Sequence, residues 1–338
     1  MIDKKFIYNA VRSVQNAVVK SVIDARNKTD ADDLQQVAFD NPEDTIYQID
    51  KATESQLLEW INKEFGEQFP IVLIAEGINE GKALCIPSYV KPDECKYRMI
   101  IDPIDGTRGI MYDKRSAWVL AGIAENKGNE TTLADIVFAM QTEIPLIKQR
   151  DMDIFWAWKD EEKAHGLRVN TDTYIEKQIE IKPSNSDSLA HGFVNVSRFF
   201  PGAKVELSKF EEEFIRELLG PVKPGKAHCF EDQYISTGGQ IAELISGHDR
   251  LVIDIRPLVE PVIAKKGEAL GLCCHPYDLC TELIARKSGV IITDQNGKQV
   301  NYPLDTATDC SWIGYANKTL YKNVEHVLKR TLKNQNLS

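Results

Sequence analysis

Features that define several other classes of protein are missing from this chain of 338 residues. No uninterrupted apolar run approaches the roughly 18 residues of a membrane-spanning helix. Residues 1–6 lack the apolar core and cleavage site of a secretory signal peptide, so we expect a cytoplasmic protein without a membrane partner. The hydrophobic content of 43% is ample for a large core, which is typical of a soluble globular protein of one or two domains.

An excess of positive charge is also absent, because 41 Lys and Arg residues against 51 Asp and Glu residues leave a net charge of −10. Such a chain would be repelled by a phosphate backbone, so we expect no nucleic acid polymer as a partner. Arg108, Lys114 and Arg115 are a local exception and could form a positive rim beside an acidic pocket. As loop residues, Lys114 and Arg115 could equally be solvated charges without a role.

The cysteines follow no repeated spacing, and their number is odd, which disfavours an extracellular disulfide framework. They are Cys85, Cys95, Cys229, Cys273, Cys274, Cys280 and Cys310. A zinc cluster from Cys273, Cys274, His275 and Cys280 is an alternative, but a second C-x-x-C pair is missing. Reduced and mostly buried thiols are therefore the preferred interpretation.

The most informative segment is Asp102-Pro103-Ile104-Asp105-Gly106-Thr107, which follows the apolar run 99–101. This order predicts a buried strand that ends in a turn rich in carboxylates. Pro103 fixes its own φ and lacks a donor, and Gly106 lets a backbone N–H approach a ligand closely. Such a turn can bind both a phosphate and Mg²⁺.

This segment resembles the D-P-[IL]-D-G-T signature of the inositol monophosphatase family of Mg²⁺-dependent, lithium-sensitive phosphatases. Three further family elements occur in the expected order: an acid that opens a helix (Asp50), a glutamate that ends the preceding strand (Glu76), and a late acid at a helix start (Asp278). The departures are Glu76-Gly77 in place of two glutamates, Arg108-Gly109-Ile110 in place of Asn-Phe, and Tyr277-Asp278-Leu279 in place of Trp-Asp and small residues. The metal positions are kept while the substrate-facing positions differ.

Mg²⁺ prefers oxygen ligands and binds through a few carboxylates together with substrate phosphate. Two cations roughly 3.5 to 4 Å apart can activate a water and stabilise the leaving oxygen in an in-line displacement. The resemblance implies two or three Mg²⁺ ions per site. The expected ligands are the side chains of Glu76, Asp102, Asp105 and Asp278 and the carbonyl of Ile104.

The resemblance also assigns roles around the metals. Thr107 and Asp50 match the pair that activates water, and Glu76 assists as ligand and base. The phosphate is expected on the backbone N–H groups of Gly106 and Thr107. The substrate-facing residues are expected to be Asp105, Thr237, Gly238, Asp254 and Asp278.

Each of these residues has a simpler interpretation when it is taken alone. Asp50 can cap a helix, and Asp278 can be an acid in the first turn of a helix. Thr107 can be an ordinary turn hydroxyl, and Glu76 a surface acid at a strand end. The joint occurrence of all four in order favours a functional site.

Hydrophobic periodicity predicts two α/β lobes, about 1–183 with the metal motif and about 184–338 facing the substrate, within one domain. The resemblance implies an α/β (α+β) fold, the layered α-β-α-β-α sandwich, with the active site between the lobes. Helices are predicted over 6–26, from near 50 to 65, 210–219, 241–245 and 278–287, the last ended by Gly289. Strands are predicted over 71–74, 97–101, 118–123, 136–140, 154–158, 193–196, 251–255 and 290–293, with a hairpin turn at Asn296-Gly297.

The expected activity is Mg²⁺-dependent hydrolysis of a small phosphorylated alcohol, an inositol phosphate or a related sugar or nucleotide phosphate. Two alternatives lie in the same superfamily: 3′(2′),5′-bisphosphate nucleotidase and fructose-1,6-bisphosphatase. A non-catalytic sugar-phosphate sensor is the alternative from another class. The segment Arg256–Cys274 is longer than the family's and is either a lid, a partner surface or an excursion without a role. A homodimer is the assembly that family members often form.

Overall fold

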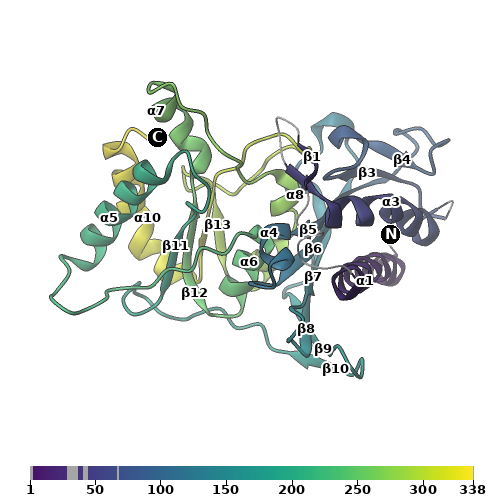
Figure 1. The fold of residues 1–338 in the computed structure, drawn as a ribbon, viewed down its shortest axis with the longest axis horizontal. Helices are drawn as coiled ribbons and strands as arrows, with labels where there is room; N and C mark the ends of the chain where they lie inside the picture. Colours follow the sequence, from purple (N-terminus) through teal and green to yellow (C-terminus); the bar gives the residue numbers. More distant parts are fainter. Residues whose placement is uncertain (1–2, 29–36, 41–44, 67, 338) are drawn as a thin grey trace.

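The chain folds into five alternating layers of helix and sheet. The computed structural model describes residues 3–28, 37–40, 45–66 and 68–337, and over 37–40 and 45–55 it describes the backbone alone. An eight-stranded and a four-stranded sheet lie roughly side by side, with one helical layer between them and one outside each (Figure 1). The predicted α-β-α-β-α sandwich is therefore confirmed.

The large sheet belongs to the first half of the chain and has the order β10-β9-β8-β7-β6-β5-β3-β4. All neighbouring strands are antiparallel except β3 and β5, which run parallel. The strands are β3 (Ile71–Ala75), β4 (Leu84–Ile86), β5 (Tyr97–Asp105), β6 (Ala117–Glu125), β7 (Ile136–Ile144), β8 (Asp151–Trp158), β9 (His165–Asn170) and β10 (Glu176–Ile179). A separate two-stranded sheet pairs β1 (Val37–Asp40) with β2 (Thr45–Tyr47).

Two helices cover the outer face of the large sheet. α1 (Lys4–Lys28) buries Ile7, Val11, Val14 and Val18, residues at i, i+4, i+7 and i+11 that share one helical face. α3 (Gln48–Glu64) lies beside it and contributes the buried Leu57. The spacing of apolar residues was therefore sufficient to predict both helices.

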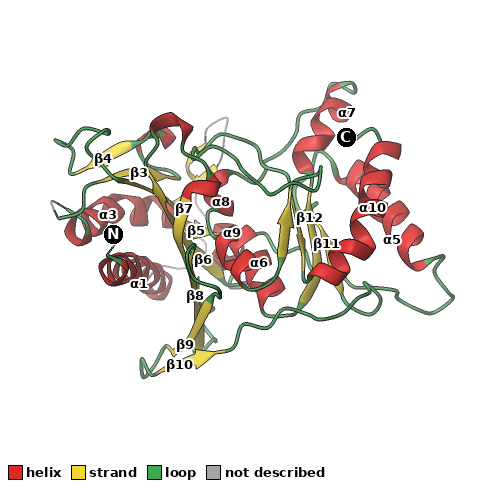
Figure 2. Ribbon diagram, turned by 180° about the vertical axis from the view of Figure 1, so that it is seen from behind, coloured by secondary structure: helices red, strands yellow, loops and turns green. Residues whose placement is uncertain are grey.

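The middle layer carries the helices that matter for the site. α6 (Thr237–Ile245), α8 (Pro276–Leu279) and α9 (Glu282–Lys287) lie between the two sheets (Figure 2). Their apolar residues and those of the inner face of the large sheet form one continuous core. Elements of the second half of the chain thus pack directly on strands of the first half.

The small sheet has the order β11-β12-β14-β13, and only β11 and β12 are parallel. Its strands are β11 (Phe193–Val196), β12 (Asp249–Asp254), β13 (Ile291–Thr293) and β14 (Trp312–Tyr315). α5 (Lys204–Leu219) and α10 (Lys318–Asn334) cover its outer face. Short helical segments complete the chain: α4 (Thr107–Met111), α7 (Glu260–Ala264), and the 3-10 turns η1 (Asn79–Gly81), η2 (Gly128–Glu130), η3 (Leu133–Asp135) and η4 (Arg256–Val259).

Two local predictions differ from the structure. The helix predicted over 278–287 is two helices, because the chain leaves α8 at Cys280 and starts α9 after the buried Thr281. A turn does form at Asn296-Gly297, where the Gly297 N–H donates to the Asp294 carbonyl at 3.1 Å, but β13 pairs with the distant β14 instead of an adjacent strand. None of the helices in the described ranges combines the length and apolar character needed to cross a membrane.

Candidate active site

Asp102 and Asp105 were predicted in a turn after the strand, but both lie within β5, where a β-bulge directs them toward the same face of the large sheet. Asp102 pairs with Leu120 of β6 and Asp105 with Trp118, so three steps along β5 match two along β6. In a regular strand, residues three apart point to opposite faces, and one extra residue reverses the second of them. Pro103, which cannot donate a ladder hydrogen bond, lies inside the irregularity. The Ile104 N–H donates to Asp102 Oδ1 at 2.9 Å and holds the bulge.

Glu76 is brought to Asp102 by the parallel pairing of β3 and β5. Ala75 is opposite Ile101, and the Glu76 N–H donates to the Ile101 carbonyl at 3.3 Å. Both carboxyls therefore follow at the carboxyl ends of adjacent parallel strands. The neighbouring Glu76 carboxyl helps to raise the pKa of Asp102, because two ionised carboxylates repel one another unless a proton or a cation is shared between them.

Asp105 connects the large sheet to the middle layer. Its Oδ2 accepts from the Ser236 hydroxyl at 2.9 Å and from the Gly238 N–H at 2.6 Å. Ser236 is also the N-cap of α6 and accepts from the Gly239 N–H, so it serves the helix and Asp105 together. Because both donors reach Oδ2, the other oxygen of Asp105 is the one suited to a further ligand.

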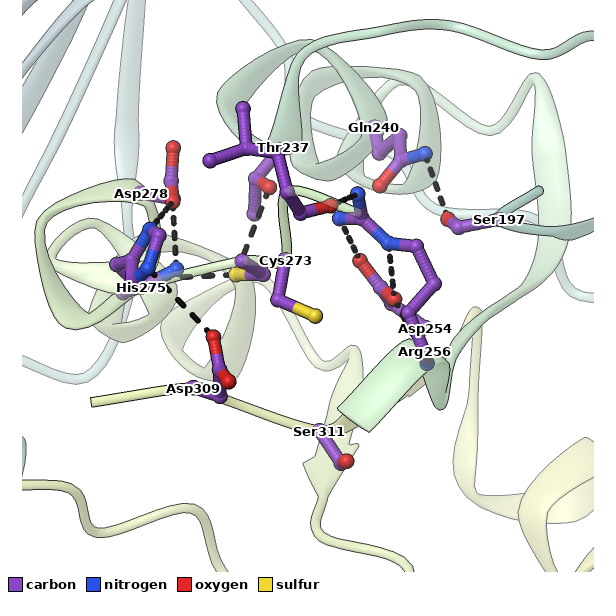
Figure 3. A network of polar contacts seen from close by, with 12 residues as sticks. Ser197, Thr237, Gln240, Asp254, Arg256, Cys273, His275, Asp278, Asp309 and Ser311 are labelled. Carbon is purple, nitrogen blue, oxygen red and sulfur yellow. Dashed lines mark hydrogen bonds and ion pairs between the residues drawn. The ribbon is translucent and has the colours of Figure 1, made fainter. Parts of the chain in front are cut away.

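Asp278 reaches the same place from α8. Its Oδ2 accepts from the His275 N–H at 2.6 Å, which closes a capping box at the helix start. The His275 ring lies 3.6 Å from Asp309 and 3.0 Å from the Tyr277 hydroxyl. Figure 3 shows His275 between Asp278 and Asp309. Asp278 is thus both a helix-start acid and part of the cluster.

One carboxylate oxygen from each of Asp102, Asp105 and Asp278 lies within 4.8 Å of the other two. Burial and the neighbouring carboxyls of Glu76, Asp105 and Asp278 raise the pKa of Asp102 well above its ordinary value. Burial raises the pKa of Asp105 to about 6, although the Gly238 and Ser236 donors oppose this. Burial and the Asp105 and Glu76 carboxyls raise the pKa of Asp278 as well. An all-oxygen set with excess negative charge fits Mg²⁺.

This charge excess predicts an unusual pH dependence of the metal-free protein. Because the folded state binds these protons more tightly than the unfolded state, the free energy of unfolding rises as pH falls through the raised pKa values toward about 4. For Asp105 the pH range over which the free energy of unfolding changes lies between 3.8 and about 6. For Asp102 this pH range extends to higher pH. We expect Asp102→Asn in EDTA at pH 8 to be more stable than the wild type by on the order of 1–2 kcal/mol.

Urea denaturation in EDTA between pH 5 and pH 8 measures this difference, which should shrink as the pH falls. A variant that is less stable than the wild type at pH 8 without metal would show that the carboxyls do not repel one another.

Gly106 and Thr107 form the turn after β5. Gly106 has φ +100° and a Cβ there would lie 3.1 Å from Ser236 Cβ, so the left-handed backbone conformation favours glycine and the space for a side chain is tight. Thr107 begins α4, and its hydroxyl donates to the Ile104 carbonyl at 2.9 Å. The first backbone N–H groups of a helix have no acceptor within it. The phosphate position at Gly106 and Thr107 stays a prediction.

The remaining predicted residues lie at different places. The backbone of Asp50 is in α3, but its side chain lies outside the described residues. Thr237 opens α6 and its hydroxyl donates to Cys274 Sγ at 3.7 Å. Asp254 is fully buried, and its two oxygens accept from Arg256 at 2.8 and 2.6 Å. Figure 3 places the Asp254–Arg256 pair across Thr237 from Asp278. The contact of Asp254 with the leaving alcohol stays a prediction.

The cysteines are free thiols, five of them buried. Burial, and then the Asp102, Asp278 and Asp105 carboxyls, raise the pKa of Cys280 well above its ordinary value, so this thiol stays protonated and is a poor metal ligand. Within the described part of the chain, Asp102, Asp105 and Asp278 are the group placed to hold a metal, and the cysteines with His275 are not.

Several residues of the site were not predicted. Asp309 comes close to His275 only through tertiary structure. His275 and Arg256 are near Asp278 and Asp254 in the sequence as well, and Ser236 had a local signal as a helix N-cap residue before Thr237. Arg256 also donates to the Leu272 carbonyl at 2.6 Å and so ties together the two ends of the Arg256–Cys274 segment. The outer part of that segment reaches α5 through a Lys266–Glu206 ion pair.

Comparison with solved structures gives the same fold. The IMPase of Thermotoga maritima superposes with a TM-score of 0.59 at 16% identity, covering 97% of this chain and 98% of that one. The SuhB extragenic suppressor protein of Bartonella henselae superposes with a TM-score of 0.60 at 15% identity, covering 96% of this chain and 98% of that one. The fructose-1,6-bisphosphatase of Leishmania major superposes with a TM-score of 0.65 at 12% identity, covering 95% of this chain and 93% of that one.

No protein-family model matches the sequence, and no curated protein matches it. At these identities the likeness shows the fold alone. The chain has the inositol monophosphatase-like fold over nearly its whole length, and the predicted resemblance is confirmed at that level.

Proposed function

We propose that this protein is a Mg²⁺-dependent phosphomonoesterase that hydrolyses a small phosphorylated alcohol. The observation that carries the proposal is the cluster of Asp102, Asp105 and Asp278, whose carboxylate oxygens lie within 4.8 Å of one another. It lies beside Glu76 and the Gly106-Thr107 turn, so a metal site and a phosphate site adjoin. The solved phosphatases with this fold support the same class of reaction.

The protein would hold Mg²⁺, two or three ions, through Glu76, Asp102, Asp105, Asp278 and the Ile104 carbonyl. Bound Mg²⁺ supplies a water of lowered pKa and polarises phosphate oxygens. The backbone N–H groups of Gly106 and Thr107 would bind the phosphate.

The Thr107 proton is directed to the Ile104 carbonyl, so its oxygen can accept from a water and orient it. We assign Asp50 to the same task and Glu76 to proton removal. Around the leaving alcohol, Asp105 and Asp278 would contribute from the cluster itself, and Thr237, Gly238 and Asp254 from the second lobe.

A screen of phosphate release with Mg²⁺ tests the proposal and the substrate class together. The panel is an inositol monophosphate, a 3′,5′-bisphosphorylated nucleoside, fructose 1,6-bisphosphate and other sugar phosphates. We expect release from at least one of these groups. Binding of a sugar phosphate without release from any compound would favour the sensor.

Lithium provides a further prediction. Li⁺ should inhibit at millimolar concentration and uncompetitively with the substrate, if it displaces a weakly held Mg²⁺ at Asp102, Asp105 and Asp278. Leu279 stands beside this position where the family has a small residue, so Leu279→Ala should change the inhibition constant. Steady-state kinetics at several Li⁺ concentrations, with K⁺ as control, measure the effect. Activity that Li⁺ does not inhibit would show that the Asp278 position differs from that of the resembled enzymes.

A further inference from the structure

Gln141 lies in the large sheet in the same row as a predicted metal ligand. It belongs to β7 and is completely buried. Across the strands, Gln141 pairs with Leu120, and Leu120 pairs with Asp102. Residues in one cross-strand row face the same side of a sheet. Gln141 therefore faces the middle helical layer, as Asp102 does.

The side-chain amide of Gln141 bonds to two helices of that layer. Its Nε2 donates to the Gly238 carbonyl at 3.2 Å, at the start of α6. Its Oε1 accepts from the Thr281 hydroxyl at 2.9 Å, immediately before α9. Gly238 also donates its own N–H to Asp105 at 2.6 Å. A continuous chain of hydrogen bonds thus joins Asp105, Gly238, Gln141 and Thr281.

The start of α6 is pressed tightly onto the sheet at this point. A side chain at Gly238 would approach Leu120 Cδ2 to 2.4 Å and Asp105 Oδ2 to 3.0 Å. Thr281 is also completely buried, and it separates α9 from α8, which carries Asp278. A buried amide is costly unless its donors and acceptors are bonded. An apolar residue would fill this position in the row between Leu120 and Phe155 at less cost, so polar contacts explain a glutamine here.

We propose that Gln141 is a positioning residue for the metal cluster. By fixing Gly238 and Thr281 relative to one sheet position, it sets the orientation of Asp105 against that of Asp278. Two carboxylates from distant parts of the chain then present their oxygens to one cation without reorganisation. This inference rests on the proposed function, because it assigns Gln141 a role toward the cation.

Gln15 of α1 is a matched control in the same protein. It is also completely buried, and its Nε2 donates to the Val119 and Met140 carbonyls at 3.1 and 2.9 Å. Its Oε1 accepts from Thr142 at 2.6 Å. Thr142 follows Gln141 in β7, so Gln15 bonds to the opposite face of the same strands. None of these three hydrogen bonds reaches an element that carries Asp102, Asp105 or Asp278.

Calorimetric titration of the EDTA-stripped full-length protein with Mg²⁺ tests the proposal without an activity assay. Gln141→Met should raise the Kd for Mg²⁺ roughly three- to tenfold, the range expected for losing a hydrogen bond. Gln15→Met should destabilise the fold and yet leave the Kd within about twofold of the wild type. Thr281→Val should weaken Mg²⁺ binding like Gln141→Met, and Thr281→Ser should restore it.

If the Gln141→Met protein does not fold, the Kd values for Mg²⁺ of Thr281→Val and Thr281→Ser test the inference instead. An unchanged Kd in both Gln141→Met and Thr281→Val overturns this inference while leaving the proposed function intact. An equal loss of affinity in Gln15→Met would also overturn it, since loosening of the sheet would then be the cause. A wild type that binds no Mg²⁺ overturns the proposed function and this inference with it.

Discussion

Asp102→Asn should lower kcat for phosphate release by more than about a hundredfold, since outer-shell changes at metal sites alone typically cost about 10- to 100-fold. Asp102 is assigned directly to the metal, between Glu76 and the Asp105 and Asp278 carboxyls. The substitution keeps the acceptor for the Ile104 N–H, so the bulge should survive. Steady-state kinetics over a range of Mg²⁺ concentrations measure the loss.

The control for Asp102→Asn is Asp153→Asn on β8. Asp153 makes a bidentate ion pair with Arg168 outside the cluster, so its loss should leave kcat unchanged. The earlier prediction adds a second signature for Asp102→Asn, namely greater stability than the wild type in EDTA at pH 8. A fully active Asp102→Asn protein would overturn the metal assignment.

Thr107→Ala should lower kcat by on the order of a hundredfold while KM changes little, as expected for a group that assists proton transfer. The backbone N–H groups at 106 and 107 that we assign to the phosphate remain after this substitution. Thr107→Ser keeps the hydroxyl that donates to the Ile104 carbonyl, and we expect it to retain most of the activity.

Single-turnover kinetics at saturating substrate would isolate the chemical step for Thr107→Ala. A rise in KM with an unchanged kcat would make Thr107 a binding group. A parallel loss in Thr107→Ser would indicate that packing around the methyl group, and not the hydroxyl, matters.

The strand ends that carry the site were predictable because local sequence determines them. The apolar runs before Glu76 and Asp102 predict buried strands. Pro103 with Gly106 predicts a turn from Asp102, whereas β5 continues to Asp105 and the turn begins at Gly106. The bulge that turns Asp102 and Asp105 to one face was not predictable, since it depends on the register with Leu120 and Trp118 of β6. Register between strands is a property of the sheet and not of one segment.

Contacts between distant segments account for most of what the sequence did not reveal. Asp105 meets Ser236 and Gly238 only because α6 packs on the sheet. The helix predicted from Asp278 is divided at Thr281, whose hydroxyl bonds to Gln141 of a distant strand.

Composition and periodicity were not enough for every element either. α10 is absent from the predicted elements, although its buried Leu320, Val324, Val327 and Leu328 recur at helical spacing. The short strand β4 has too few residues for a periodic signal. β10 is mostly exposed on both faces, so it shows no alternation of apolar and polar residues.

The most direct test is to strip the wild-type protein with EDTA, return Mg²⁺ in steps, and follow phosphate release from the best substrate of the screen. We predict no release without metal and recovery as Mg²⁺ fills the Asp102–Asp105–Asp278 cluster. The Asp102→Asn protein, treated in parallel, should not recover. Release that continues undiminished in EDTA, or that returns equally in Asp102→Asn, would contradict a metal-dependent phosphatase site at this cluster.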